Sequence, residues 1–278
     1  MRILHLSDTH LTREPGPNAD GIDTRLVLAG LLNDCSGIAG LDAVLVTGDV
    51  ADDGSASAYD DVRALVGEFA DARGIPVLWT TGNHDSRTAF ASSLGFPAAT
   101  AAFLAASTMI KDHRVITLDT LVPGKAYGLL GSAQLEWLRS VLATPAPGGT
   151  VLAFHHPPIA LDVEVQQKLN LLDAAGLADA IRGRDVRLIL TGHFHLQLFG
   201  LLEAVPVWVT PGVVNRIDLT GPPGTERAVR GASATLVDLS SPGSPLLHVL
   251  HARDPRAGQL AHETAPEVMA RVIAELGP

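Results

Sequence analysis

Residues 3–10 read Ile3-Leu4-His5-Leu6-Ser7-Asp8-Thr9-His10. A short apolar run with branched side chains, of the kind that forms a buried strand, ends here in an aspartate and a histidine. Carboxylates and imidazoles are common ligands of divalent metals. The first expected strand therefore carries two candidate metal ligands, Asp8 and His10, at its carboxyl end.

Four further motifs repeat this arrangement along the chain. They are Gly48-Asp49-Val50-Ala51-Asp52, Gly82-Asn83-His84-Asp85, His155-His156 and Gly192-His193-Phe194-His195, and each follows an apolar run. In open α/β sheets, ligands bind beyond the carboxyl ends of the strands. We therefore expect one rim of the sheet to gather two aspartates, one asparagine and four histidines.

Apolar runs alternate with amphipathic segments up to residue 195. The expected strands are residues 3–6, 43–47, 77–80, 115–118, 151–154 and 186–190. The expected helices are residues 24–38, 57–73, 132–142 and 171–182. This alternation predicts a layered α/β domain.

The pattern changes after His195. Residues 197–202, 205–210, 232–238 and 245–251 are expected to be mostly antiparallel strands, which can supply a second sheet packed on the first. Residues 220–231 are expected to form a mobile loop, and residues 266–276 a short helix. We expect one domain over residues 1–252, followed by a C-terminal tail with a short helix over residues 253–278.

Composition narrows the choice of function. Of the 278 residues, 46% are hydrophobic, which is ample for a large core. The net charge of -10 argues against binding long nucleic acid, which needs a basic face, although bound metals would still attract a small phosphorylated substrate. A single cysteine, Cys35, excludes an intramolecular disulfide. Without a signal peptide or a membrane span, we expect a soluble cytoplasmic protein.

The five motifs resemble those of the calcineurin-like metallophosphoesterases, whose pattern is D-x-H, G-D-x-x-D, G-N-H-D/E, a lone H and G-H-x-H. All five blocks occur in order between residues 8 and 195. The opening strand, Arg87 after the third motif, and Phe154-His155-His156-Pro157-Pro158 also look like the class III cyclic nucleotide phosphodiesterase branch. The resemblance implies a four-layer α-β-β-α sandwich of two mixed β-sheets flanked by helices.

The resemblance also implies two metal sites. One metal would be held by Asp8, His10, Asp49 and His195, and the other by Asp49, Asn83, His155 and His193. Asp49 would bridge the two, because a carboxylate has two oxygens. The ions would be divalent or mixed-valence, with Mn and Fe preferred and Zn, Co or Ni possible.

His84 is not a ligand in this scheme. The resemblance implies that it contacts the substrate phosphate together with Asn83, and stabilises charge or protonates the leaving alkoxide. Asp52 and Asp85 are expected to support the ligands or anchor loops, and Asp85 can orient His84. Two metals about 3.5–4 Å apart clamp a phosphoryl group and supply hydroxide for in-line attack.

The implied substrate is a small phosphodiester, above all 3',5'-cyclic AMP or another cyclic nucleotide, cleaved to the nucleoside monophosphate. The same site also suits a glycerophosphodiester or other alkyl phosphodiesterase, a phosphomonoesterase or a nucleotide pyrophosphatase. A scaffold protein with degraded catalysis is disfavoured because all seven ligands and His84 are intact. A homodimer is possible, with the apolar residues 98–106 either at its interface or packed on their own domain.

Four residues near the motifs have two interpretations. Arg87 either meets the substrate or lies on the surface, and Asp119 either approaches the site or caps a turn. His156 is expected to pack or hydrogen-bond nearby rather than bind metal, because the motif makes His155 the ligand. His5, in the middle of the first strand, is expected to be a core histidine with satisfied hydrogen bonds.

Overall fold

Two mixed β-sheets lie face to face in the computed structural model, which describes residues 1–96, 103–241, 243 and 245–278. Sheet one has the strand order β13 (Leu246–His251), β12 (Ser233–Asp238), β1 (Arg2–Leu6), β2 (Ala43–Thr47) and β3 (Val77–Thr80). Sheet two has the order β4 (Ala106–Ile110), β5 (His113–Thr117), β6 (Thr150–Ala153), β7 (Val186–Thr191), β9 (Val205–Val209) and β8 (Leu198–Leu202). The six strands expected before residue 195 are all present.

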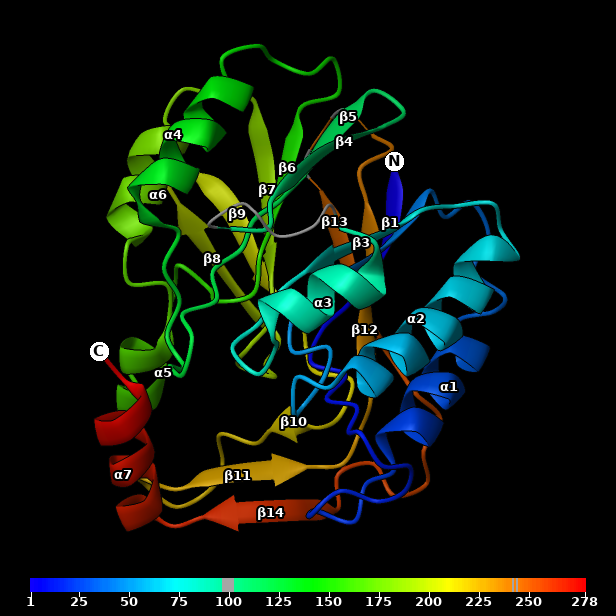
Figure 1. The fold of residues 1–278 in the computed structure, drawn as a ribbon, viewed down its shortest axis with the longest axis vertical. Coiled ribbons are helices and arrows are strands. Elements are labelled where there is room, and N and C mark those ends of the chain that lie inside the picture. The colour runs from blue at the N-terminus through cyan, green and yellow to red at the C-terminus, as the bar shows by residue number, and fades with distance from the viewer. Residues whose placement is uncertain (97–102, 242, 244) are drawn as a thin grey trace.

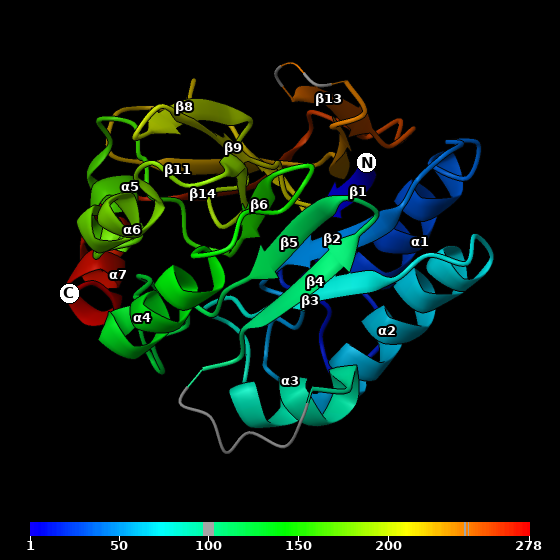
Figure 2. The same ribbon diagram turned by 90° about the horizontal axis from the view of Figure 1, so that it is seen from above.

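Helices cover the outer face of each sheet (Figure 2). Beside sheet one lie α1 (Thr24–Asp34), α2 (Ala56–Asp71) and α3 (Arg87–Leu94), and beside sheet two lie α4 (Gly131–Val141) and α6 (Ala174–Ile181). The expected four-layer α-β-β-α sandwich is therefore confirmed. Within the described residues, every helix is too short or too polar to cross a membrane.

Strand alternation distributes apolar side chains over three core layers. Along β2, Leu45 packs between the two sheets, whereas Val44 and Val46 face α1 and α2. Leu152 and Ile189 of sheet two pack against α4 and α6. Because successive side chains of a strand point to opposite faces, strands covered on both sides must be apolar throughout. This explains why the central strands are continuous apolar runs.

The sequence suggested that the four strands expected after His195 supply a second sheet. They do not form a sheet of their own. Instead β8 and β9 complete sheet two, while β12 and β13 complete sheet one, with β12 antiparallel to β1. The sequence pattern marks each strand but not its partner. Sheet membership depends on contacts between strands far apart in the chain, and these leave no local signal.

A third, small sheet lies at one end of the molecule (Figure 1). It consists of β10 (Arg216–Ile217), β11 (Glu226–Val229) and β14 (Leu260–Thr264), with α5 (Glu164–Leu169) and α7 (Pro266–Leu276) beside it. The prediction of a loop over residues 220–231 is therefore wrong, because β11 lies within it and pairs with β14.

The tail beyond residue 252 contains the expected helix, α7, and also the strand β14. The boundary between a domain and a tail at residue 252 stays a prediction. Residues 98–102 of the candidate dimer segment lie outside the described part of the chain.

Candidate metal centre

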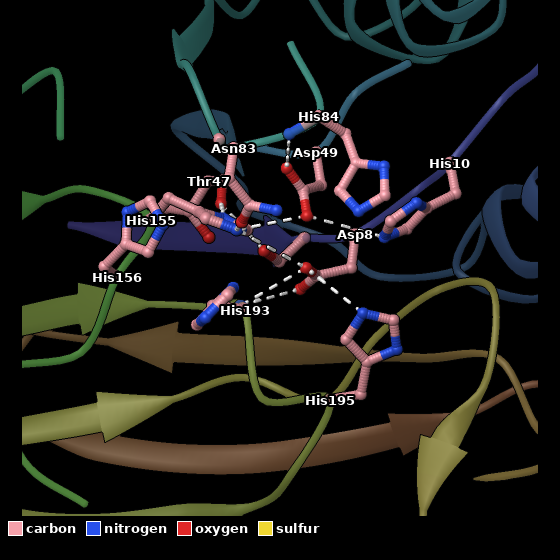
Figure 3. A network of polar contacts seen from close by, with 12 residues as sticks. Asp8, His10, Thr47, Asp49, Asn83, His84, His155, His156, His193 and His195 are labelled. Atoms are coloured by element: carbon pink, nitrogen blue, oxygen red, sulfur yellow. Dashed lines mark hydrogen bonds and ion pairs between the residues drawn. The ribbon is translucent and has the colours of Figure 1, made fainter. Parts of the chain in front are cut away.

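The five motifs converge where strands of the two large sheets end (Figure 3). Sheet one supplies the residues that follow β1, β2 and β3, namely Asp8, His10, Asp49 and Asn83. Sheet two supplies the residues that follow β6 and β7, namely His155, His193 and His195. All seven candidate ligands are thus gathered at one rim.

Asp49 lies between two groups of donors. Its Oδ2 is 3.6 Å from Nε2 of His10 on one side and 3.2 Å from Nε2 of His155 on the other. The same His155 atom is 3.2 Å from Oδ1 of Asn83. In the first group, Nε2 of His195 is 3.3 Å from Oδ1 of Asp8. Donor atoms of Asp8, His10 and His195 lie within 4.8 Å of one another, as do those of Asp8, Asp49 and His155.

The backbone turns sharply at most of these ligands. Positive φ angles occur at Asp8 (57°), His10 (46°), Asp49 (45°), His193 (70°) and His195 (50°). The left-handed region is uncommon for residues with a side chain and costs on the order of 1–3 kcal/mol each. Five such residues at one rim indicate that the fold holds strained conformations in order to point these side chains inward.

The glycines of the motifs allow the strand ends to approach one another. A Cβ atom at Gly82 would overlap Oδ1 of Asp49, and one at Gly48 would lie 2.5 Å from Nδ1 of His155. Side chains at either position would push the ligands apart. The glycine in these motifs is therefore a steric requirement of the site.

Hydrogen bonds orient three of the imidazoles. Nδ1 of His155 donates to the carbonyl of Thr47 (2.8 Å), that of His10 to Asp52 (2.8 Å), and that of His195 to Asn215 (2.6 Å). Each partner atom is an acceptor, so Nδ1 carries the proton and Nε2 is free to bind a metal. These outer partners fix both the tautomer and the direction of the ring.

The residues present fit a metal centre. Nε2 of His10 is buried and has no hydrogen-bond partner among the described residues, although a buried polar atom normally has one. Imidazole nitrogens, carboxylates and an amide oxygen form a donor set suited to Mn, Fe, Zn or Co. A cation would satisfy the unpaired nitrogen and hold the facing carboxylates together.

The centre is electrostatically prepared for cations. Burial would raise the pKa of Asp8, but the facing His195 lowers it to about 2. Burial would also raise the pKa of Asp49, but His155 lowers it well below its ordinary value. Burial would lower the pKa values of His155 and His195, yet the facing Asp49 and Asp8 raise both to about 9. The two carboxylates thus favour protonation of the facing imidazoles, and a metal bound at Nε2 would compete with that proton.

His84 lies beside the ligand cluster and stays accessible. Its backbone N–H donates to Oδ1 of Asp49 (2.9 Å), and its Nδ1 donates to the carbonyl of Asp52 (3.0 Å). The expectation that Asp85 orients this ring is wrong. Asp85 instead accepts backbone N–H groups of Gly82, Val50 and Ala51, which fastens the second motif to the third.

The neighbouring residues with two interpretations can now be placed. His156 is buried and its Nδ1 is 2.7 Å from Oγ1 of Thr120, so it hydrogen-bonds nearby as expected. Arg87 donates through Nε to the buried Asp119 (2.6 Å), and this pair ties α3 to the end of β5. Neither member of the pair is among the candidate ligands.

Asn215 was not identified from the sequence, although it holds His195. It lies outside the five motifs, a few residues after β9, and no spacing rule connects it to its partner. Its only signal is its place after an apolar strand, the feature shared by the seven candidate ligands.

Comparison with known proteins places the site in context. Residues 1–197 match the family model described as calcineurin-like phosphoesterase. The chain is 42% identical over 234 residues to a probable cyclic nucleotide phosphodiesterase of Rhodococcus erythropolis, covering 83% of this chain and 76% of that protein. It is 38% identical over 284 residues to a cAMP/cGMP dual specificity phosphodiesterase of Mycobacterium tuberculosis, covering 99% of this chain and 86% of that protein.

A solved structure shares the fold. A purple acid phosphatase from yellow lupin superposes with a TM-score of 0.63 at 15% identity, covering 99% of this chain and 55% of that longer one. At this level of identity, the likeness concerns the arrangement of sheets and helices alone.

Proposed function

The chain belongs to the calcineurin-like phosphoesterase family and is a phosphodiesterase, and from this premise we propose that it hydrolyses 3',5'-cyclic nucleotides, cyclic AMP first, at a two-metal centre. The two relatives described above are both named as cyclic nucleotide phosphodiesterases. The product would be the nucleoside monophosphate.

The observation that carries the proposal is the position of Asp49 between His10 and His155. One metal is assigned to Asp8, His10, Asp49 and His195, and the other to Asp49, Asn83, His155 and His193. When bound, two such ions neutralise charge on a phosphoryl group and activate water at neutral pH. We assign Mn and Fe to these sites, with Zn, Co or Ni as substitutes.

The protein's own groups then position and protonate the substrate. Asn83 adds an oxygen donor without adding negative charge, which leaves the centre attractive to an anionic diester. His84 is held by the Asp49 carboxylate and the Asp52 carbonyl, yet about 41% of its side chain remains exposed. Its imidazole is placed to stabilise charge on the phosphate oxygens and to protonate the leaving 3'-oxygen.

The test is a comparison of substrates with Mn-loaded protein, each with and without chelator. The panel consists of 3',5'-cyclic AMP, 2',3'-cyclic AMP, glycerophosphocholine and an aryl phosphomonoester. We expect chelator-sensitive turnover that is fastest on 3',5'-cyclic AMP. Faster cleavage of glycerophosphocholine would contradict the substrate assignment, and turnover that survives complete metal removal would contradict the metal assignment.

The variant His84→Ala tests whether His84 acts in the catalytic step without contributing to metal binding. We expect it to keep the metal content of the wild type and to lose roughly 10²- to 10⁴-fold in kcat, the usual contribution of a positioned acid or base. An unchanged kcat would remove His84 from the reaction.

A further inference from the structure

A cavity of about 320 Å³ opens beside the candidate metal centre. His193, Phe194 and His195 form one wall, and the remaining walls come from α5, the segment 215–227 and His262 of β14. The size lies within the range of about 300–1,000 Å³ that is usual for small-molecule sites. Because His193 and His195 are also candidate metal ligands, a group bound in this cavity would lie next to a phosphate held at the centre.

The walls of this cavity are largely apolar. Val165 and Leu169 of α5 face Ile217, Leu219 and Pro222 of the opposite segment. Apolar side chains favour a flat, weakly hydrated group such as an aromatic ring. A polyol such as glycerol would leave its hydroxyl groups without partners against these walls.

The charges around the cavity disfavour a second phosphate. Among the described lining residues, Arg227 is the only lysine or arginine. Its Nε donates to Glu263 (2.8 Å), and its guanidinium lies 3.7 Å from Asp218. Because its charge is already balanced, the far end of the cavity suits a neutral group better than an anion.

Gln166 provides a directional polar group in this wall. It is only 5% exposed, and its Oε1 accepts the backbone N–H of Leu161 (3.1 Å). That hydrogen bond distinguishes the amide oxygen, Oε1, from the amide nitrogen, Nε2. Its Nε2 donors have no partner among the described residues, so they are available to an acceptor in the cavity.

We propose that this cavity receives the base of the cyclic nucleotide, with Gln166 donating a hydrogen bond to a ring nitrogen or carbonyl oxygen of that base. The inference rests on the proposed function and adds where the base is selected. The family match ends at residue 197, whereas the wall formed by residues 215–227 and His262 follows it. Base selection is thus assigned largely to the part of the chain that lies beyond the matched catalytic region.

Filling the cavity tests the inference. The variant Val165→Trp places a bulky ring in it, and Leu26→Trp, on the exposed face of α1, is the matched control. Each is assayed on 3',5'-cyclic AMP and on 1-deoxyribose 3',5'-cyclic phosphate, which lacks the base. We expect the ratio of kcat/KM for cyclic AMP to that for the abasic compound to fall at least tenfold in Val165→Trp alone.

The outcomes separate this inference from the proposed function. Wild-type protein that cleaves neither cyclic phosphate contradicts the proposed function itself. Wild-type protein that cleaves cyclic AMP, with an unchanged ratio in a folded, metal-loaded Val165→Trp variant, overturns the cavity assignment alone.

A second pair of variants tests the hydrogen bond. Gln166→Glu keeps an acceptor for Leu161 but loses the donor, and Gln167→Glu adds the same charge at the exposed neighbouring position. We expect Gln166→Glu to raise KM for cyclic AMP about three- to tenfold, the value of one hydrogen bond, without raising KM for the abasic compound. An equal effect of both variants, or on both substrates, would overturn the role of Gln166.

Discussion

At the scale of single residues, the candidate metal centre depends on how closely one strand end approaches the next. Gly82 lies directly against Asp49, and no larger residue fits there without moving the carboxylate that we assign to both metal sites. Small displacements matter in such a site, because a shift of about 1 Å can cost roughly 10²-fold in rate.

We therefore expect Gly82→Ala to lose about 10²-fold in kcat/KM and to bind less metal than the wild type. Gly37→Ala is the matched control, since a Cβ there meets nothing within 4 Å. Turnover and metal content of both purified variants, with circular dichroism to confirm folding, provide the measurement. Wild-type metal content and rate in Gly82→Ala would show that the close approach is unimportant.

The seven candidate ligands could be predicted from the sequence because each occupies a fixed place in a short motif after an apolar run. The residues that orient them were harder to identify. The carbonyl of Thr47 holds His155, but every residue has a carbonyl, so the sequence cannot mark it. Asn215 holds His195 from outside the motifs. Local sequence patterns identify the candidate ligands. The groups that orient those ligands come from distant parts of the chain, and only the folded structure brings them together.

At the scale of elements, strand β1 carries a buried titratable group as well as two candidate ligands. His5 is fully buried, and its Nε2 lies 2.8 Å from Oγ1 of Thr47, which confirms the expected core position. The expectation that all its hydrogen bonds are satisfied is wrong, because the buried Nδ1 has no partner among the described residues. Burial lowers the pKa of His5 from 6.5 to about 3. The unfolded chain therefore binds a proton at this residue at a pH where the folded chain does not.

This difference makes stability depend on pH. Between pH 6.5 and about 3 the unfolded state holds more protons, so His5 lowers the free energy of unfolding by up to about 1.4 kcal/mol per pH unit as the pH falls. We expect His5→Gln to flatten this dependence over pH 4.5–6.5 and to leave it unchanged above pH 7. Urea unfolding of both proteins at several pH values is the measurement, and parallel curves would contradict it.

The elements themselves were predictable where they are long or buried. The strands of the two large sheets follow from apolar periodicity with the exception of β4, and so do α1, α2, α4, α6 and α7. The short elements α3, α5, β4, β10, β11 and β14 did not, because each is brief and exposed or half exposed along part of its length. The strand β11 pairs with β10 and β14, which lie elsewhere in the chain and leave no signal in its own sequence. Of these, α5, β11 and β14 contribute to the cavity assigned to the base, so sequence patterns say less about the conformation of its walls than about the candidate ligands.

At the scale of the whole molecule, the candidate metal centre spans the two sheets. Sheet one contributes Asp8, His10, Asp49 and Asn83, and sheet two contributes His155, His193 and His195. Metal binding should therefore join the two halves of the sandwich. A ligand that binds only the folded state at 100 times its Kd adds about 2.7 kcal/mol of stability.

We expect Mn²⁺ at such an excess to raise the Tm of metal-free protein by about 5–10 °C, given roughly 2–4 °C per kcal/mol for a chain of this size. Asn83→Ala and His155→Ala should bind one ion per chain instead of two, show a smaller rise and turn over little substrate. Calorimetry with metal analysis checks this. Two ions per chain in either variant would contradict the assignment of the second site.

The antiparallel pairing of β1 with β12 also orders events during synthesis. One edge of β1 has no partner until residues 233–238 have been made. By then all seven candidate ligands, which end at His195, have already been made, while β14 is still to come. All seven candidate ligands are therefore made before that edge can be paired, and the part of the cavity wall that β14 contributes is made only afterwards.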